Sequence, residues 1–221
     1  MTTRKPARTS RPRTKPGTIP STLWACGPAP IEVADGWPPR VLARALLEYS
    51  APGDRVLLMP RTPEAEFLVG ELDRVSAHTP GHDQIADTDL IVATTLPPRA
   101  RGLRPWMVAE VASTRLKAGG LLVVLARSHR DRDGSFRDLT GDLVTEAQNT
   151  DLLYLQHLVA APVDGAEVVA TGARLDTTGD PENPGEHGES DSSGESGATP
   201  TDPVHIDVLV FLQPHDLTTA A

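Results

Sequence analysis

The sequence predicts an α/β fold in which helices cover both faces of a doubly wound, mostly parallel sheet. Short apolar runs alternate along the chain with longer segments whose apolar residues recur at helical spacing. Gly, Pro and polar residues bound each apolar run, as expected for buried strands. Parallel strands also need a crossover connection, and the intervening helices provide one.

The first elements of this alternation lie between residues 39 and 94. Residues 39–50 have helical periodicity, and the apolar run at 55–59 is a predicted strand ending at a proline. The sequence Thr-Pro-Glu at 62–64 supplies a cap, a first-turn proline and an early acid, so we expect a helix from about 63 to 75. A second buried strand is predicted at 90–94.

The next elements continue the same pattern. Residues 106–116 have helical periodicity, and Gly119-Gly120 stands where a helix terminator is expected. Residues 121–126 form the strongest predicted strand, and a helix is expected at about 138–149. Two final strands, at 152–161 and 205–212, have no predicted helix between them. They are therefore predicted to form an antiparallel hairpin that closes the sheet.

Charge is distributed unevenly over the 221 residues, whose formal net charge is −9. Residues 1–17 form a predicted disordered arm with no acid, and residues 176–203 form a predicted disordered acidic insert in the terminal hairpin. We expect residues 18–214 to be the folded domain and 215–221 a tail. The cations of the arm are Arg4, Lys5, Arg8, Arg11, Arg13 and Lys15, and they are candidates for contacts with nucleic-acid phosphates. The alternative is a solvated tail.

Disulfides, metal sites and membrane spans find little support in the sequence. Cys26 is the single cysteine, so an internal disulfide and a cysteine-rich zinc site are excluded. His78, His82 and Asp83 have a metal-like spacing, but the Pro-Gly at 80–81 between them forbids a helix, and we expect a polar loop without metal. No apolar run approaches the length of a membrane span, and no signal peptide is recognisable. The sequence therefore predicts a cytoplasmic protein without membrane contact.

Four segments carry a resemblance to a known family. They are Ser-Thr-Leu-Trp-Ala at 21–25, the stretch 38–58 with its Pro-Gly-Asp turn, Thr-Thr-Leu-Pro-Pro at 94–98, and the stretch 119–141. In these segments the chain resembles actinobacterial proteins related to the DNA methyltransferases that modify the exocyclic amines of cytosine (N4) or adenine (N6). The resemblance implies an S-adenosylmethionine-dependent methyltransferase fold, which is Rossmann-like and ends in an antiparallel hairpin.

The resemblance also places the cofactor loop, which departs from the family pattern. In active members the first strand leads into a glycine-rich turn that holds S-adenosylmethionine. Here the matching residues contain no glycine, and prolines at 60 and 63 remove two backbone donors. Nothing matches the family's acid after the second strand, and we expect one or two strands to be lost between 75 and 90. The candidate cofactor-binding residues are Leu58, Met59, Pro60, Arg61 and Thr62. No cofactor is expected to bind unless the enzyme is active with S-adenosylmethionine.

The catalytic motif of the family is altered as well. Thr95 and Pro97 match the positions that orient the target amine, but the aromatic position that stacks on the base falls on Pro98 or Arg99. Three arginines follow this motif at the predicted carboxyl end of a strand and are candidates for nucleic-acid binding: Arg99, Arg101 and Arg104. Ordinary solvated loops are the alternative interpretation of these arginines.

The leading hypothesis is a degenerate DNA-methyltransferase-like domain that is non-catalytic and serves as a nucleic-acid-binding or interaction module. Two alternatives remain open. One is an active S-adenosylmethionine-dependent DNA methyltransferase with a divergent cofactor loop. The other is a protein–protein interaction module without any role in nucleic-acid binding. The sequence leaves the DNA target, the protein partner and the oligomeric state undetermined.

Overall fold

The computed structural model describes the folded core of the chain. The described residues are 22–32, 36–78, 86–96, 103–127, 129–130, 136–137, 139–165, 167–168 and 205–215. The predicted basic arm, the predicted acidic insert, Pro97, Arg99 and Arg101 lie outside the described residues.

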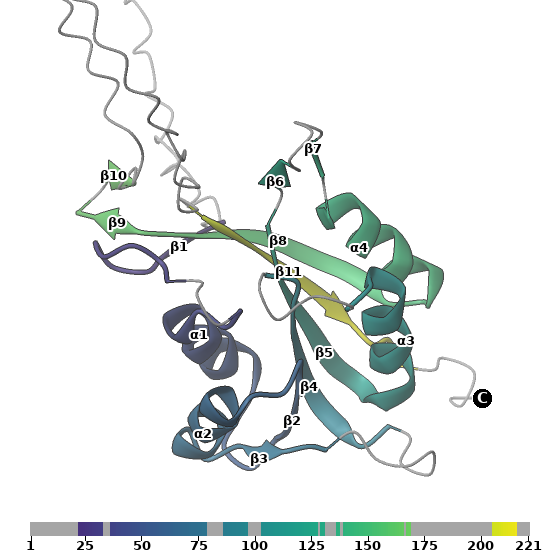
Figure 1. Ribbon diagram of the computed structural model, residues 1–221. Helices are drawn as coiled ribbons and strands as arrows, with labels where there is room; N and C mark the ends of the chain where they lie inside the picture. Colours follow the sequence, from purple (N-terminus) through teal and green to yellow (C-terminus); the bar gives the residue numbers. More distant parts are fainter. Residues whose placement is uncertain are drawn as a thin grey trace, which may run out of the picture.

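A seven-stranded sheet forms the centre of the molecule (Figure 1), in the order β1-β8-β11-β5-β4-β2-β3. The strand β11 is antiparallel to its neighbours β5 and β8, and the other pairs in the sheet are parallel. The predicted doubly wound sheet with a closing antiparallel hairpin is therefore confirmed. The strands are β1 (Leu23–Ala25), β2 (Arg55–Met59), β3 (Val75–Ser76), β4 (Thr88–Thr94), β5 (Leu116–Ala126), β8 (Leu153–Ala161) and β11 (Ile206–Leu212).

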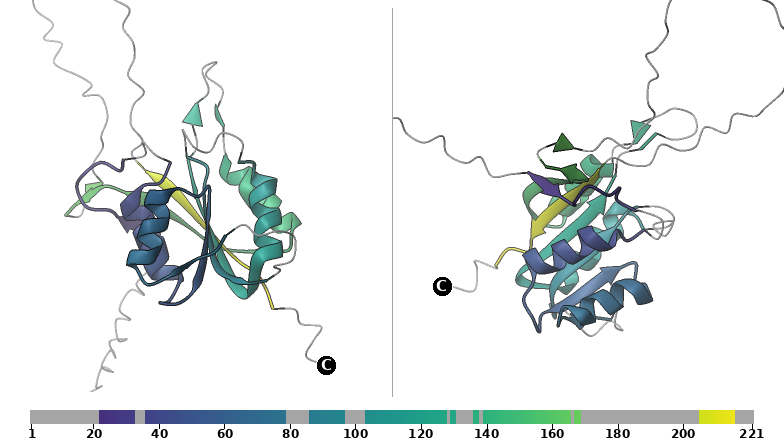
Figure 2. Two further views of the ribbon diagram at one scale, coloured as in Figure 1. Left: turned by 60° about the horizontal axis from the view of Figure 1, so that its bottom comes forward. Right: turned by 90° about the vertical axis from the view of Figure 1, so that its left-hand side faces the viewer.

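Helices pack against both faces of the sheet (Figure 2), which gives three layers. The helices α1 (Pro39–Tyr49) and α2 (Pro63–Glu71) lie on one side, and α3 (Pro105–Arg115) and α4 (Leu139–Asn149) lie on the other. Two short antiparallel ribbons complete the described structure. They are β6 (His129–Arg130) with β7 (Phe136–Arg137), and β9 (Val163–Asp164) with β10 (Glu167–Val168).

Each face of the sheet has its own apolar core, and β11 contributes to both. Val208 and Val210 belong to the cluster under α1 and α2, whereas Leu209 and Phe211 belong to the cluster under α3 and α4. All four side chains are fully buried. Successive residues of a strand point to opposite faces, so a continuous apolar run such as 206–212 requires cover on both sides. This is why β11 takes an interior position in the sheet.

The predicted helix from 63 to 75 is too long at its carboxyl end. Helix α2 stops at Glu71, and Asp73 has a left-handed φ of 60° that turns the chain. The Asp73 carbonyl accepts a hydrogen bond from the N–H of Gly53 at 2.7 Å, and the buried Arg74 donates to the Ser50 carbonyl at 2.7 Å. These contacts turn the chain into the short strand β3, parallel to β2. The region expected to have lost one or two strands thus retains at least a two-residue strand.

The Gly119-Gly120 pair was expected to end a helix and instead lies inside β5. Helix α3 ends at Arg115, and β5 begins at the next residue. The register of β5 against β4 shifts between Leu116 and Leu121, so the intervening residues form a bulge. Gly119 has a φ of 83° there, and its N–H donates to the carbonyl of Gln213 at 2.8 Å. The pair therefore shapes a bulged strand.

Strand β1 was not predicted as a strand. It pairs in parallel with the outer edge of β8 over three residues. Its central residue Trp24 is buried, stacks on Tyr49 with ring centroids 5.9 Å apart, and lies under the guanidinium of Arg44. The following Cys26 is also buried, and burial raises the pKa of its thiol.

Candidate ligand site at the carboxyl edge of the sheet

The carboxyl ends of β2, β4 and β5 lie along one edge of the sheet, because these strands are parallel. Doubly wound sheets bind their ligands at this edge. Both predicted sites lie here. The turn that follows β2 contains the candidate cofactor residues, and Thr95 directly follows β4, the neighbour of β2. The structure thus brings these two candidate sites to adjacent strand ends.

Side chains of the turn after β2 already contact the helix that follows it, α2. The hydroxyl of Thr62 caps α2 by accepting a hydrogen bond from the Ala65 N–H at 3.2 Å, and Thr62 is only 4% exposed. Arg61 forms an ion pair with Glu66, one turn further along. Glu64 and Glu66 also place two carboxylates in the first turn of α2. Acids at a helix N-terminus already interact with its positive end, so a bound anion gains little there.

The segment that precedes α1 closes the same edge. Trp37 is 6% exposed, and its indole N–H donates a hydrogen bond to the Pro60 carbonyl at 3.1 Å. One residue earlier, the Gly36 carbonyl accepts a hydrogen bond from the hydroxyl of Thr94 at 2.7 Å. Residues 36–38 are all buried, and we call this segment the Gly-Trp-Pro bridge. The bridge connects the carboxyl ends of β2 and β4 through groups of the chain itself.

Thr95, the candidate that orients an amine, is half-buried and bound to the neighbouring strand. Its backbone N–H donates to the Leu125 carbonyl at 2.9 Å, and its hydroxyl donates to the same carbonyl at 3.3 Å. The following Leu96 is fully buried. The Thr95 hydroxyl proton is therefore engaged, and only the oxygen lone pairs of Thr95 remain to meet a ligand.

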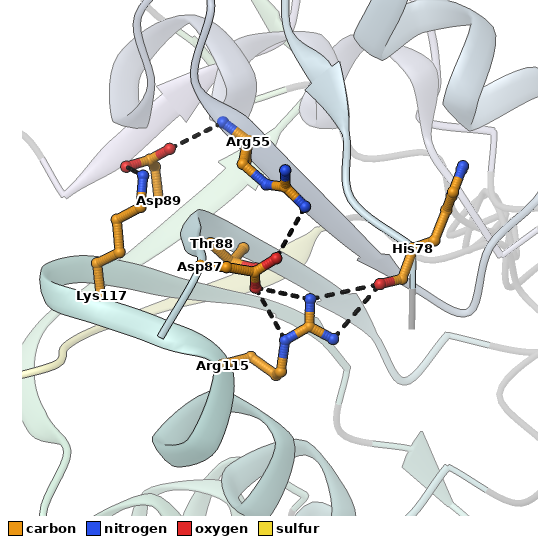
Figure 3. Close-up of polar contacts among 7 residues, drawn as sticks. All are labelled: Arg55, His78, Asp87, Thr88, Asp89, Arg115 and Lys117. Carbon is orange, nitrogen blue, oxygen red and sulfur yellow. Dashed lines mark hydrogen bonds and ion pairs between the residues drawn. The ribbon is translucent and has the colours of Figure 1, made fainter. Parts of the chain in front are cut away.

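Strand β3 stops short of this edge, because it pairs only with Arg55 and Val56 at the start of β2. After Ser76 the chain continues with Ala77, which is buried, and His78, whose carbonyl accepts hydrogen bonds from Arg115 at 3.3 and 3.4 Å (Figure 3). The described residues that directly follow β3 are thus a buried alanine and a histidine whose carbonyl is already bound, and none of residues 75–78 carries a carboxylate.

The geometry of this edge decides whether S-adenosylmethionine fits. A cofactor here needs close approach to the backbone and free donors on the turn. Every turn position carries a Cβ, Pro60 and Pro63 have no N–H to donate, and the Thr62 hydroxyl caps its own helix. The residues present do not fit the cofactor.

A hollow of about 240 Å³ lies elsewhere, beside the first turn of α1. None of residues 58–62 lines it, and neither does Thr95. It is lined by Ala29, Pro30, Ile31, Glu32, Pro38, Pro39 and Arg40. The hollow therefore adjoins the Gly-Trp-Pro bridge at Pro38 and is separate from the β2 turn.

Three further findings concern metal ligands, membrane-spanning helices and a buried charged pair at Asp207, which lies opposite the last residue of β5 at this edge. Within the described ranges, no three His, Cys, Asp or Glu side chains come together as a metal site. The buried Asp207 of β11 is paired with His157 of β8, Nε2 to Oδ1 at 2.8 Å. These residues are 50 positions apart, so their spacing could not have predicted the pair. In the same described part, no helix has the length and apolar character needed to cross a membrane.

The sheet order decides the fold class, because the antiparallel strand β11 lies between β5 and β8. The fold is methyltransferase-like. Methyltransferases are also among the solved structures that this chain resembles. One is a 1,6-didemethyltoxoflavin-N1-methyltransferase from Burkholderia thailandensis, with a TM-score of 0.42 and 11% identity over 82% of this chain and 80% of that one.

Two other similar structures are longer than the matched region. A protein from Thermus thermophilus, provisionally named a DNA modification methylase, has a TM-score of 0.31 and 13% identity over 79% of this chain and 51% of that chain. A provisionally named sarcosine dimethylglycine methyltransferase from Galdieria sulphuraria has a TM-score of 0.40 and 12% identity over 55% of this chain. The chain spans 63% of that protein, which is less than two thirds. No protein-family model and no curated protein match the sequence.

Proposed function

We propose that this methyltransferase-like domain is non-catalytic and binds nucleic acid along the carboxyl edge of its sheet. The hydrogen bond from Trp37 to the Pro60 carbonyl carries the first part of this proposal. It places a buried indole on the turn where a methyl-donor cofactor is expected to lie. The side chain that closes the turn is part of the packed core, so opening the turn would expose it.

The nucleic-acid part of the proposal is supported by the distribution of charge. Six cations and no acid occur in the first 16 residues of the sequence. Arg104 is exposed at the start of α3, which follows β4, and Arg99 and Arg101 precede it in the sequence. Cations that neutralise phosphates give an affinity that falls steeply with salt.

The first experiment is a calorimetric titration of the full chain with S-adenosylmethionine and, separately, with S-adenosylhomocysteine. We expect no heat of binding at millimolar ligand, because every position of the turn carries a Cβ and the prolines at 60 and 63 supply no backbone donor. A micromolar dissociation constant for either compound would contradict the non-catalytic part of the proposal. Trp37→Phe is the matched variant, since it removes the indole donor and keeps an aromatic ring in the core.

A second titration addresses nucleic acid. A fluorescein-labelled 15-nucleotide single strand is titrated with the full chain at several salt concentrations between 50 and 200 mM. If all six cations of residues 1–16 contact phosphates, the slope of log affinity against log salt is about −4. A chain that lacks residues 1–16 is then expected to have a much shallower slope. Absence of binding at 50 mM salt would contradict this part of the proposal.

One observation favours a second candidate, an active methyltransferase with a divergent cofactor loop. Thr95 directly follows β4, and within the described part of the chain no group donates a hydrogen bond to its hydroxyl oxygen. Under that candidate, transfer of a labelled methyl group from S-adenosylmethionine to DNA is measurable, and Thr95→Ala abolishes it. Under the proposal above, the wild-type chain and Thr95→Ala are equally inactive.

A further inference from the structure

One of the three tryptophans differs sharply from the other two. Trp24 and Trp37 are 5% and 6% exposed, and both belong to the core under α1 and α2. Trp106 is 53% exposed, although a large aromatic ring is costly to leave in water. It is the second residue of α3, whose buried residues Val108, Ala109 and Ala112 lie on another side of the helix. The ring therefore does not serve the packing of α3.

The surroundings of Trp106 suit an anionic, aromatic ligand. Arg104 is exposed, two residues before Trp106, and has no ion-pair partner among the described residues. The first turn of α3 contains no acid, and no side chain caps it. The positive end of such a helix attracts anions. Pro105 has no N–H and the N–H groups of Met107 and Val108 already donate to the Arg104 carbonyl, so the N–H of Trp106 is the donor that this turn offers to a phosphate. The nearest acid on the same helix, Glu110, is one turn further from the N-terminus.

Phe67 shows that exposure alone does not make such a site. This ring is 69% exposed on α2. Its helix carries Glu64, Glu66 and Glu71, and its N-terminus is already capped by Thr62. A polyanion would be repelled there. Phe67 therefore offers a matched control for the effect of an exposed aromatic ring on an unsuitable helix.

We propose that Trp106 stacks on an unpaired base of a nucleic acid while Arg104 and the N-terminus of α3 contact the adjoining phosphate. This inference rests on the nucleic-acid binding proposed above and names the residues that contact the base. It also supplies an aromatic face that the altered motif at 94–98 lacks, from the start of the helix that follows that motif. Stacking needs no particular base, so the site is expected to tolerate most sequences.

The test uses the full chain and a fluorescein-labelled 15-nucleotide single-stranded DNA at 50 mM salt. Trp106→Ala is expected to weaken binding about 5- to 150-fold, the range measured for one lost base stack. Trp106→Phe is expected to retain most of the affinity, and Phe67→Ala to bind as the wild-type chain does. Arg104→Gln is expected to reduce the slope of log affinity against log salt by about 0.7, as the loss of one phosphate contact does.

Intrinsic fluorescence provides a readout that a purely structural role would not change. Unlabelled DNA is expected to quench the emission of the wild-type chain, and to leave that of Trp106→Phe unchanged, because Trp24 and Trp37 are buried. If the wild-type chain binds DNA and Trp106→Ala binds equally well, the stacking inference is wrong and the proposed function stands. If the wild-type chain does not bind DNA at all, both are overturned.

Discussion

The ion network at the amino edge of the sheet gives the most quantitative prediction. Arg115 is buried and donates two hydrogen bonds to Asp87 Oδ1, from Nε at 3.0 Å and from Nη2 at 2.7 Å (Figure 3). Asp87 also pairs with Arg55 at 2.8 Å and accepts a hydrogen bond from the hydroxyl of Thr88. The network joins the starts of β2 and β4 to the end of α3. Its disruption should therefore reduce stability and leave the carboxyl edge unchanged.

The magnitude depends on which partner is removed. Removing one member of a buried ion pair costs about 3–5 kcal/mol, because the other charge is left uncompensated. In Arg115→Met, Asp87 keeps Arg55 as a partner and its side chain is 21% exposed. We therefore expect the free energy of unfolding to fall by about 2–3 kcal/mol. Asp87→Asn leaves the guanidinium of Arg115 with only 6% exposure, and we expect about 3 kcal/mol. The double variant should lose about 1–3 kcal/mol less than the sum of the two.

The assay is urea denaturation followed by circular dichroism, with Lys117→Met as the control. Lys117 pairs with Asp89 at 2.7 Å in the same region, but the two side chains are 44% and 28% exposed. Loss of such a pair costs about 1 kcal/mol or less. If Arg115→Met is within about 0.5 kcal/mol of the wild-type chain, or if Lys117→Met costs as much, the reasoning from burial is refuted.

The same network makes stability depend on pH. Partial burial raises the pKa of Asp87, but the hydrogen bonds from Arg115 and Thr88 and the charges of Arg115 and Arg55 outweigh it, so the pKa is lowered. A carboxyl group with a lowered pKa stabilises the fold fully above its unfolded value, and this contribution is lost as pH falls through the folded value. The difference in unfolding free energy between the wild-type chain and Asp87→Asn should therefore shrink below about pH 4.

Three other predictions concern single residues. Gly120→Ala should lower the unfolding free energy by about 1–3 kcal/mol in a urea titration, because a Cβ there would lie 2.9 Å from the Lys117 carbonyl oxygen. Gly70→Ala on α2 is the control, because a Cβ there meets open space and should raise the unfolding free energy by up to about 1 kcal/mol. Trp37→Phe should lower the melting temperature through the lost hydrogen bond to Pro60, worth about 1 kcal/mol, and an unchanged melting temperature would contradict the importance of that bond. Cys26 should react slowly with a thiol reagent at pH 8 and rapidly in urea, since burial raises the pKa of its thiol, and fast native reaction would show that the β1 segment opens.

Local sequence patterns predicted most of the regular elements. The helix at 39–50 and the strand at 55–59 were located to within a residue, as were the two closing strands. The errors came where a distant contact overrides a local preference. The end of α2 is decided by Arg74, which reaches back to Ser50, and the glycine pair in β5 is held by Gln213 from the other end of the chain.

The candidate site, too, could be predicted only in part from the sequence. The absence of glycine after β2 is visible in the sequence, and so is the lack of an acid at 75–78. The Gly-Trp-Pro bridge was not predicted, because Thr94 and Gly36 are 58 positions apart and no periodicity relates them. The spacing of residues in α3 did not reveal that the ring of Trp106 is exposed.

The sequence by itself determined the alternation of strands and helices, the closing antiparallel pair and a β2 turn without glycine. These are local properties, set by side-chain periodicity and backbone preference. The tertiary structure decided that β11 lies between β5 and β8, that Trp37 covers the β2 turn, and that Arg115 pairs with Asp87. Such contacts depend on which distant groups can be buried together with their hydrogen bonds satisfied, and that requirement is met only when the whole chain has packed.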